Sequence, residues 1–330
     1  MIIYHGSIIR RVGSLLPSLY PKASRTDTRG RVFRSRQFVF VVGESGTEFS
    51  VHADVIANQS KALKALVSGE MAEASDGRAI FEDLDENTFI RFCQFAYTGD
   101  YTPPDFVRDP GVLVPIGRGS PPTPTKSQSA SASPRDQSPH MGYDEDEPEP
   151  LSDNELYPEE PADFLDETKP IVLKKSSRSR FLRRLLDGKD YDVETIRTSS
   201  TIRCAVRENS SATEDYTLVL LGHAQLYVFA EKWGIDDLKT AALHKLHETI
   251  TSFTLYSSRR RDIVELLRYA YSNEHTPDRG DSIDELRSLV VLYAACEVES
   301  LMLCPEFLLL LAEKGELTPD LVQWLIHPSG

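Results

Sequence analysis

Residues 38–60 read FVFVVGESGTEFSVHADVIANQS, and the spacing of their apolar residues changes partway along. Residues 38–42 are β-branched or aromatic without a break, residues 43–46 contain two glycines, and apolar and polar residues then alternate. This pattern predicts two strands joined as a hairpin. From His52 the apolar residues fall at helical spacing, which predicts two short helices separated by the polar residues 58–60.

The chain continues with a third strand and a longer helix. Residues 78–82 have the composition of a strand, and Asp85 is a suitable N-cap for the helix that follows. The apolar side chains of that helix lie on one stripe: Phe89, Phe92, Cys93, Ala96 and Tyr97. Gly99 is expected to end it. The sequence therefore predicts an α+β domain in which helices cover a small sheet.

Three groups of residues in this region resemble the BTB/POZ domains, in particular those of fungal proteins. They read FVVG at 40–43, FSVHADVIANQS at 49–60 and FAYTG at 95–99. A fourth group, HAQLYVFAEKWGI at 223–235, is similar to the words of the family's last two helices. Order, spacing and residue types agree, although each group is short. The resemblance implies a BTB/POZ fold, interrupted by an insertion, that binds other proteins and has no catalytic site. We expect no cofactor or metal.

The composition divides the chain into five parts. We expect a basic, disordered arm over residues 1–37, the first part of the BTB/POZ domain over 38–101, a low-complexity and largely disordered insertion over 102–215, the second part of the domain over 216–250 and an α-helical extension over 251–330. The arm holds eight Lys or Arg residues and one acid. A mitochondrial transit peptide is the alternative interpretation of the arm, but its prolines interrupt an amphipathic helix.

The insertion carries an acidic run and candidate phosphate acceptors. Residues 144–167 contain no Lys or Arg, and self-repulsion in a segment poor in large apolar residues favours disorder. Closing a long insertion is tolerable if its two ends lie close together in the fold. Four hydroxyl residues each precede a proline and are candidate phosphorylation sites: Ser120, Thr123, Ser133 and Ser138.

A basic patch follows the acidic run. It consists of Lys174, Lys175, Arg178, Arg180, Arg183 and Arg184. These residues surround four apolar residues within 181–186 that would lie on one side of a short helix. Three interpretations are open: pairing with the acidic run or a solvated tail, a nuclear-import or nucleic-acid patch, and a membrane-surface helix. We favour the first.

The C-terminal extension has helical spacing again. Ser282 and Glu285 form a capping box for one of its helices. Thr318 and Pro319 have the residue types of an N-cap and first helical position for the last helix.

The resemblance also indicates a partner. Met71 and Glu73 lie between the second helix and the third strand, where the family has a hydrophobic-x-acidic motif that contacts a cullin. An ordinary helix end is the alternative interpretation of these residues. The resemblance therefore implies an adaptor or scaffold, with a substrate adaptor of a cullin-type ubiquitin ligase as its more specific form. A nuclear or chromatin-associated scaffold that uses the basic segments is the alternative function.

The sequence lacks the motifs that usually mark an enzyme active site. No phosphate-binding, dinucleotide-binding or serine-hydrolase motif occurs. His244 and His247 are one turn apart on a predicted helix, but a solvated helix face explains them better than a metal. His52 is interpreted as an ordered residue at a helix start. Asp83, Asp85 and Glu86 are explained by the preference for acids at a helix N-terminus.

Net charge and cysteine usage limit the cellular compartments in which the protein is expected. A net charge of −14 argues against a nucleic-acid partner for the chain as a whole. The cysteines, Cys93, Cys204, Cys296 and Cys304, have no metal or redox spacing and are expected to be core residues in a reducing compartment. No apolar run is long enough to cross a membrane. We expect a protein of the cytoplasm, the nucleus or both.

Self-association is expected to be weak. In the family's pattern an Asp ahead of the first strand pairs with a Lys or Arg after the first helix, and many relatives dimerise there. The corresponding residues are Gln37 and Gln59, so the ion pair that would fix the contact is missing. We predict a monomer or a weak homodimer.

Overall fold

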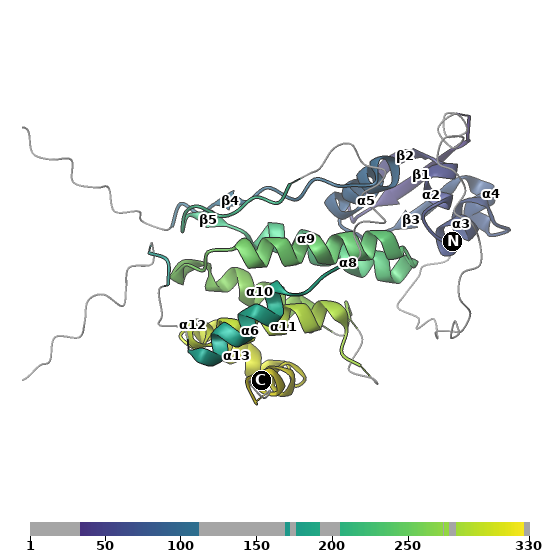
Figure 1. Cartoon of the computed structure of the whole chain (residues 1–330). Coiled ribbons are helices and arrows are strands. Elements are labelled where there is room, and N and C mark those ends of the chain that lie inside the picture. The colour runs from purple at the N-terminus through teal and green to yellow at the C-terminus, as the bar shows by residue number, and fades with distance from the viewer. Residues whose placement is uncertain are drawn as a thin grey trace, which may run out of the picture. The chain divides into compact units, whose positions relative to one another are not determined.

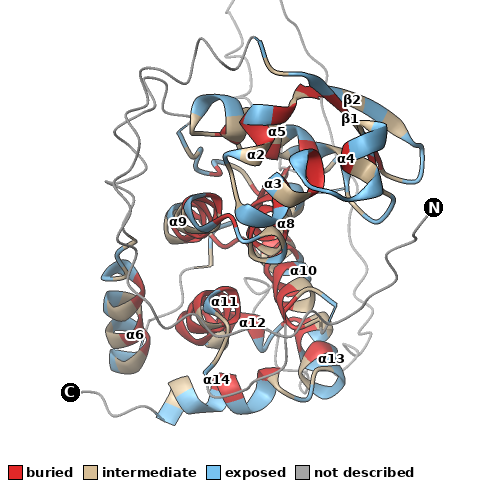
Figure 2. Cartoon of the chain, turned by 90° about the vertical axis from the view of Figure 1, so that its right-hand side faces the viewer, coloured by how far each residue is buried: buried red, intermediate tan, exposed pale blue. Residues whose placement is uncertain are grey.

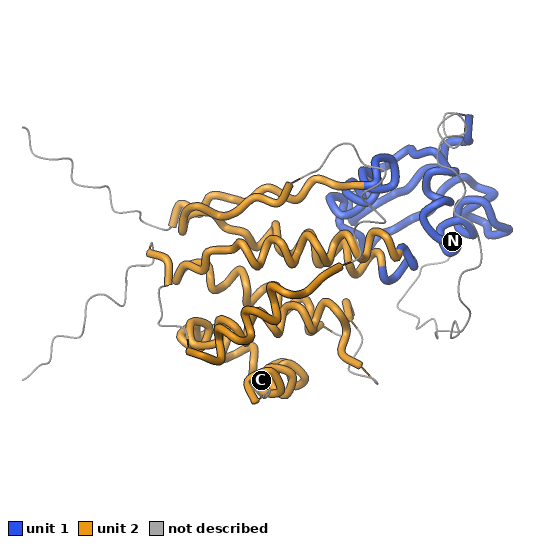
Figure 3. Tube along the Cα trace, in the orientation of Figure 1, with its two compact units in different colours: residues 1–99, 231–235 blue, residues 100–230, 236–330 orange. Residues whose placement is uncertain are grey.

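The computed structural model describes residues 34–111, 169–171, 176–191, 205–272, 274–276 and 282–326. The chain is of mixed α+β structure and divides into two compact units (Figure 3). Unit 1 comprises residues 1–99 and 231–235, and unit 2 comprises residues 100–230 and 236–330.

Unit 1 is built on a three-stranded sheet with the order β2-β1-β3 (Figure 1). The strands are β1 (Gln37–Val42), β2 (Thr47–His52) and β3 (Arg78–Phe81). β1 and β2 form the predicted antiparallel hairpin, in which Phe40 lies opposite Phe49, and β3 is parallel to β1. The turn contains Gly43 and Gly46 at φ of 74° and 67°, a backbone conformation that glycine adopts readily.

Among the described residues, four helices lie wholly within unit 1: α2 (Ala53–Ala57), α3 (Lys61–Ser68), α4 (Ala72–Asp76) and α5 (Glu86–Thr98). The two short helices after β2 were predicted, and α4 was not. Asp85 caps α5 by accepting a 2.8 Å hydrogen bond from the Thr88 amide, and Gly99 ends α5 at φ of 82°, as predicted. The sheet and helices enclose Phe38, Phe40, Phe89 and Phe92, which are completely buried. Figure 2 colours the buried residues of the chain red.

Unit 2 is mainly helical. Its helices are α6 (Ser177–Asp187), α8 (Thr217–Trp233), of which residues 231–233 belong to unit 1, α9 (Asp236–Ser252), η2 (Ser257–Arg259), α10 (Arg260–Ala270), α11 (Glu285–Cys296), α12 (Val298–Leu301), α13 (Pro305–Glu313) and α14 (Leu317–Ile326). α11 is central, because it contacts α6, α9, α10, α12 and α14. All its residues from Leu286 to Cys296 are buried except Ser288, as expected of a helix covered on every side.

The helix starts in the C-terminal extension differ in part from the prediction. The N-cap of α11 is Asp284, whose carboxylate accepts hydrogen bonds from the amides of Leu286 and Arg287, so the predicted cap at Ser282 was wrong. α14 already begins at Leu317, and the Thr318 hydroxyl donates instead to the carbonyl oxygen of Leu311 at 2.9 Å.

We predicted a largely disordered insertion over 102–215. The structure corrects this prediction, because both ends of the insertion and part of its basic segment are ordered. Strand β4 (Val107–Arg108) pairs antiparallel with β5 (Glu214–Asp215), which brings the two ends of the insertion together. Helix α6 packs on α11 and buries Leu182 and Leu186 completely. These contacts form because the segments contribute to the core of unit 2. Residues 112–168 lie outside the described residues, as does the acidic run.

The compact units also differ from the predicted boundaries. Of the expected second domain part, 216–250, only residues 231–235 belong to unit 1 with the sheet, and the others belong to unit 2. Within unit 1, Trp233 stacks on Phe81 with ring centroids 5.1 Å apart. α8 ends at Trp233 and Gly234 follows at φ of 65°, which confirms the predicted end of this helix.

Candidate functional site

Met71 and Glu73 lie at the start of α4 in unit 1. Met71 is the N-cap residue, and its carbonyl oxygen accepts hydrogen bonds from the amides of Ala74 and Ser75 at 3.1 and 3.3 Å. Met71 therefore lies between the end of α3 at Ser68 and the start of α4 at Ala72, and the cullin-contact and helix-end interpretations both stay predictions. The Met71 side chain is 45% exposed, Glu73 is half-buried and Ala74 anchors the turn in the core.

The surface around Met71 is held by short connections. α4 contacts both α3 and β3. Gly77 ends α4 at φ of 68°, and its carbonyl oxygen accepts from the Val39 amide at 2.9 Å, so the helix leads directly into the sheet. On β3, Ile80 is 53% exposed. Unit 1 thus presents one exposed apolar side chain on an ordered turn and another on an edge strand.

His52 joins two of the groups of residues that carry the BTB/POZ resemblance. The Tyr97 hydroxyl lies 2.9 Å from His52 Nδ1 and accepts a hydrogen bond from the His52 amide at 3.0 Å. His52 is the residue before α2, which confirms its interpretation as an ordered residue at a helix start. Tyr97 lies near the end of α5, so one side chain fixes the position of α5 against the end of β2.

The acids near α5 have structural roles. The Asp85 carboxylate accepts from the Thr88 amide and hydroxyl at 2.8 and 3.0 Å. Glu86 accepts hydrogen bonds from Ser45 and Thr47 in the β1–β2 turn, and these bonds lower the pKa of its carboxyl group. The interpretation of Asp85 as a helix cap is confirmed, and Glu86 ties the hairpin turn to the helix.

The two glutamines at the expected dimer position make contacts inside unit 1. Gln37 accepts a hydrogen bond from the Ser50 hydroxyl at 3.1 Å. The Gln59 amide donates to the carbonyl oxygens of Val55 and Ala96 at 3.1 and 3.4 Å. Their amides thus serve contacts within the unit, and weak self-association stays a prediction.

Only four of the six residues of the basic patch belong to the described part of the chain. Lys174 and Lys175 lie outside the described residues, whereas Arg178, Arg180, Arg183 and Arg184 belong to α6. Arg183 donates to the Thr251 carbonyl oxygen and forms ion pairs with Asp187 and Glu297 at 3.1 and 3.8 Å. Arg180 and Arg184 are exposed. A membrane-surface helix does not fit, because Leu182 and Leu186 are buried within unit 2.

The interpretation of His244 and His247 as a solvated helix face was wrong. His247 is buried, and its Nε2 atom lies 2.8 Å from the Leu186 carbonyl oxygen. The Tyr191 ring lies 6.1 Å from the His244 ring and 5.5 Å from the His247 ring. Leu186 and Tyr191 of the insertion cover the side of α9 that carries the two histidines. The local sequence around the histidines could not show this contact.

The cysteines in the described ranges lie in apolar surroundings. Cys296 and Cys304 are buried, as predicted, and Cys93 is half-buried. Desolvation raises the pKa of the Cys93 thiol to about 12, so the reactive thiolate is scarce at neutral pH. Cys204 lies outside the described residues.

The structure bears in part on the predictions about phosphorylation sites, metal sites and membrane spans. Ser120, Thr123, Ser133 and Ser138 all lie outside the described residues. Among the residues that the structure describes, no three His, Cys, Asp or Glu side chains gather in a way that could hold a metal ion. None of the helices in the described ranges is long and apolar enough to cross a membrane.

Comparison with known proteins adds no family to this description. No protein-family model matches the chain, and a search of curated proteins found no match. The BTB/POZ resemblance therefore depends on the four groups of residues quoted from the sequence.

Proposed function

We propose that the chain is a non-catalytic protein–protein interaction adaptor or scaffold built on a BTB/POZ domain. Two lines of support come from unit 1. The strand, hairpin, helix, strand and helix follow one another as the resemblance implies, and two of its sequence words meet in the hydrogen bonds between His52 and Tyr97. The adaptor works by presenting surfaces, without a cofactor.

The proposed partner is a cullin, so that the chain would be a substrate adaptor of a ubiquitin ligase. The observation that carries this proposal is the exposed side chain of Met71 on an ordered helix start, with Glu73 in the first turn of α4. Met71 would fill an apolar pocket of the cullin, and Glu73 would supply an ion pair or a hydrogen bond at its rim.

Binding to a purified cullin N-terminal domain tests this proposal. Calorimetry should give a measurable Kd for the wild type, and the Met71→Ala, Glu73→Ala double variant should weaken binding at least tenfold, as expected for loss of a buried anchor. The matched control is Ile90→Ala, Glu82→Ala, because Ile90 is 40% exposed and Glu82 is exposed in the same unit. Equal binding by the wild type and the double variant would show that Met71 and Glu73 do not form the contact. If the wild type does not bind, the proposal of a cullin partner is wrong.

The second candidate function is a nuclear or chromatin-associated scaffold. It is favoured by the exposed Arg180 and Arg184 on α6. Deleting this segment would remove buried leucines, so charge substitution is the better test. A fluorescent fusion in which Lys174, Lys175, Arg180 and Arg184 are changed to Gln should lose nuclear signal. A wild-type fusion confined to the cytoplasm would contradict the proposal.

A further inference from the structure

Residues 254–259, which link α9 to α10, hold three separate pieces of the insertion. We call these residues the junction turn. Asn209 exchanges hydrogen bonds of 2.8 and 2.7 Å with the backbone of Thr254, and the Ile171 amide donates to the Leu255 carbonyl oxygen at 3.1 Å. Asp109 forms an ion pair of 2.6 Å with Arg259. The described residues on both sides of the gap at 112–168 are therefore held at the same turn, through Asp109 before it and Ile171 after it.

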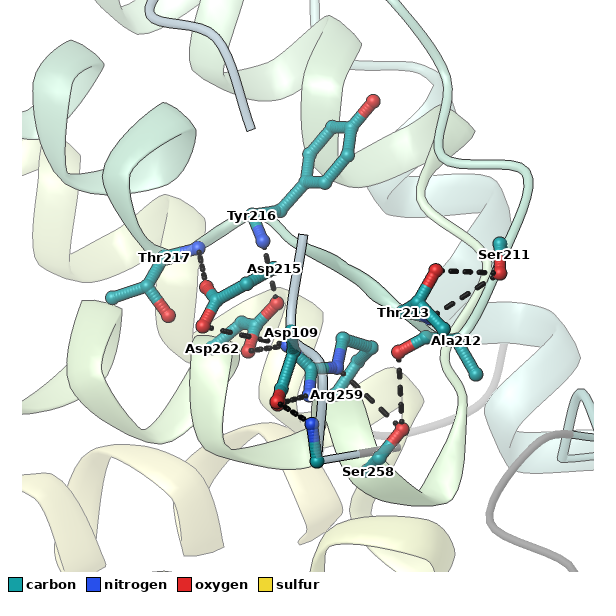
Figure 4. A network of polar contacts seen from close by, with 11 residues as sticks. Asp109, Ser211, Ala212, Thr213, Asp215, Tyr216, Thr217, Ser258, Arg259 and Asp262 are labelled. Atoms are coloured by element: carbon teal, nitrogen blue, oxygen red, sulfur yellow. Dashed lines mark hydrogen bonds and ion pairs between the residues drawn. The ribbon is translucent and has the colours of Figure 1, made fainter. Parts of the chain in front are cut away.

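The junction turn is fixed by an unbalanced cluster of charges (Figure 4). The Arg259 guanidinium is buried and lies 2.6 Å from Asp109, 3.4 Å from Asp215 and 3.8 Å from Asp262. Asp109 follows β4, Asp215 belongs to β5 and Asp262 to α10. If all four groups were ionised, one positive charge would face three negative charges in a partly dry environment, which is unfavourable.

Asp262 is the most buried of the three carboxylates. It accepts a 2.8 Å hydrogen bond from the Tyr216 amide, and the Thr217 hydroxyl also bonds to it. The charged and titratable groups that face it are Arg259 from η2, Asp215 from β5 and Tyr293 from α11. Burial raises the pKa of Tyr293 well above its usual value, so Tyr293 stays neutral.

Two opposite pKa shifts follow from this arrangement. Desolvation, and then the charge of Asp215, raise the pKa of Asp262 to about 7 in spite of Arg259. The hydrogen bond from Arg259 lowers the pKa of Asp109. Near neutral pH, Asp262 is therefore the carboxyl group that binds and releases a proton, whereas Asp109 stays ionised.

We propose that Asp109, Asp215, Asp262 and Arg259 form a proton-controlled latch that holds the β4–β5 ribbon on helix α10 and loosens when Asp262 loses its proton. The latch joins the two described ends of the insertion, β4 and β5, to α10.

The sign of the effect follows from linkage. A carboxyl group whose folded pKa is raised above its unfolded value stabilises the closed form at low pH, and this contribution is lost as pH rises through the folded pKa. The latch is therefore tight near pH 4, loosens up to about pH 7 and changes little above that value. Asp109 adds no pH dependence to the stability of the latch between pH 4 and pH 7, because its pKa is lowered and lies below this interval.

Amide hydrogen exchange of the full chain tests the latch. Peptides covering residues 105–111 and 209–217 should have protection factors, corrected for intrinsic rates, that fall on the order of tenfold or more from pH 5 to pH 7. Asp262→Asn should abolish this fall while keeping the hydrogen bond from Tyr216. The control is Asp320→Asn, since Asp320 is a buried carboxylate that accepts from the Tyr271 hydroxyl elsewhere in unit 2. This control should retain the wild-type ratio.

Two results would overturn the proposal: equal wild-type protection at both pH values, or the same fall in Asp262→Asn. If that variant does not fold, Asp215→Asn takes its place. Removing the like charge of Asp215 should lower the pKa of Asp262, so the ratio of protection factors between pH 5 and pH 7 should shrink. An unchanged or larger ratio in Asp215→Asn would also contradict the latch.

Discussion

Truncating the buried leucines of α6 should destabilise unit 2. Leu182 and Leu186 are completely buried, and α6 packs on α11. A buried Leu→Ala change costs about 2–5 kcal/mol through lost transfer energy and the cavity left behind. Because α6 has only one packed face, we expect each of Leu182→Ala and Leu186→Ala to lower the free energy of unfolding by about 2–3 kcal/mol. Leu185→Ala is the control on the same helix, since Leu185 is only half-buried.

Tryptophan fluorescence can report on unit 2 alone. The chain has two tryptophans, Trp233 in unit 1 and Trp324 in unit 2. In a Trp233→Phe background, the emission of the half-buried Trp324 follows the unfolding of unit 2 in urea. The two leucine variants should shift the midpoint to lower urea with an unchanged slope, as expected when stability falls and the exposed area stays the same.

A small effect would refute the packing of α6. If Leu182→Ala and Leu186→Ala each stay within about 0.5 kcal/mol of the parent, as exposed substitutions do, α6 does not contribute to the core. The sequence-based expectation of disorder across this segment would then be right. An equally large loss in Leu185→Ala would indicate instead that the helix as a whole is sensitive to truncation.

Further predictions concern single contacts and the association state. Tyr97→Phe removes the hydroxyl that bonds to His52 and should cost unit 1 about 0.5–1 kcal/mol in urea denaturation. Gly222→Ala places a Cβ 2.3 Å from the Pro104 ring, so we expect a loss of about 1–3 kcal/mol in unit 2, and an unchanged midpoint would contradict this close approach. Asp262→Asn should remove a fall in unfolding free energy of up to about 4 kcal/mol between pH 4 and pH 7, because the pKa of Asp262 is raised from 3.8 to about 7; an unchanged pH slope would refute this. Light scattering should give a monomer or a weak dimer, and a dimer mass that persists at nanomolar concentration would exclude this.

Local signals predicted unit 1 well. The hairpin follows from two β-rich runs around a glycine turn, and the ends of α5 follow from Asp85 and Gly99, because each cap acts on residues a few positions away. The location of Met71 and Glu73 was also predicted. The helix that begins there was not, because α4 has only five residues and therefore shows no hydrophobic period.

Contacts between distant parts of the chain could not be predicted. β4 and β5 have two residues each, too few to show the alternation of a strand, and they pair across more than a hundred residues. The amphipathic pattern of α6 was visible, but the sequence did not show what its leucines would meet. The burial of His247 follows from that missing contact, since the Leu186 carbonyl oxygen lies 2.8 Å from its ring.

The latch could not be predicted from the sequence either, because its four charged residues come from three distant segments. Asp109 and Asp215 lie near the two ends of the insertion, and Arg259 and Asp262 follow α9. The cost of closing a chain grows only slowly with its length, by about 0.6 kcal/mol for each doubling. The distance between the ends matters more, and Asp109 and Ile171 are both bonded to the junction turn.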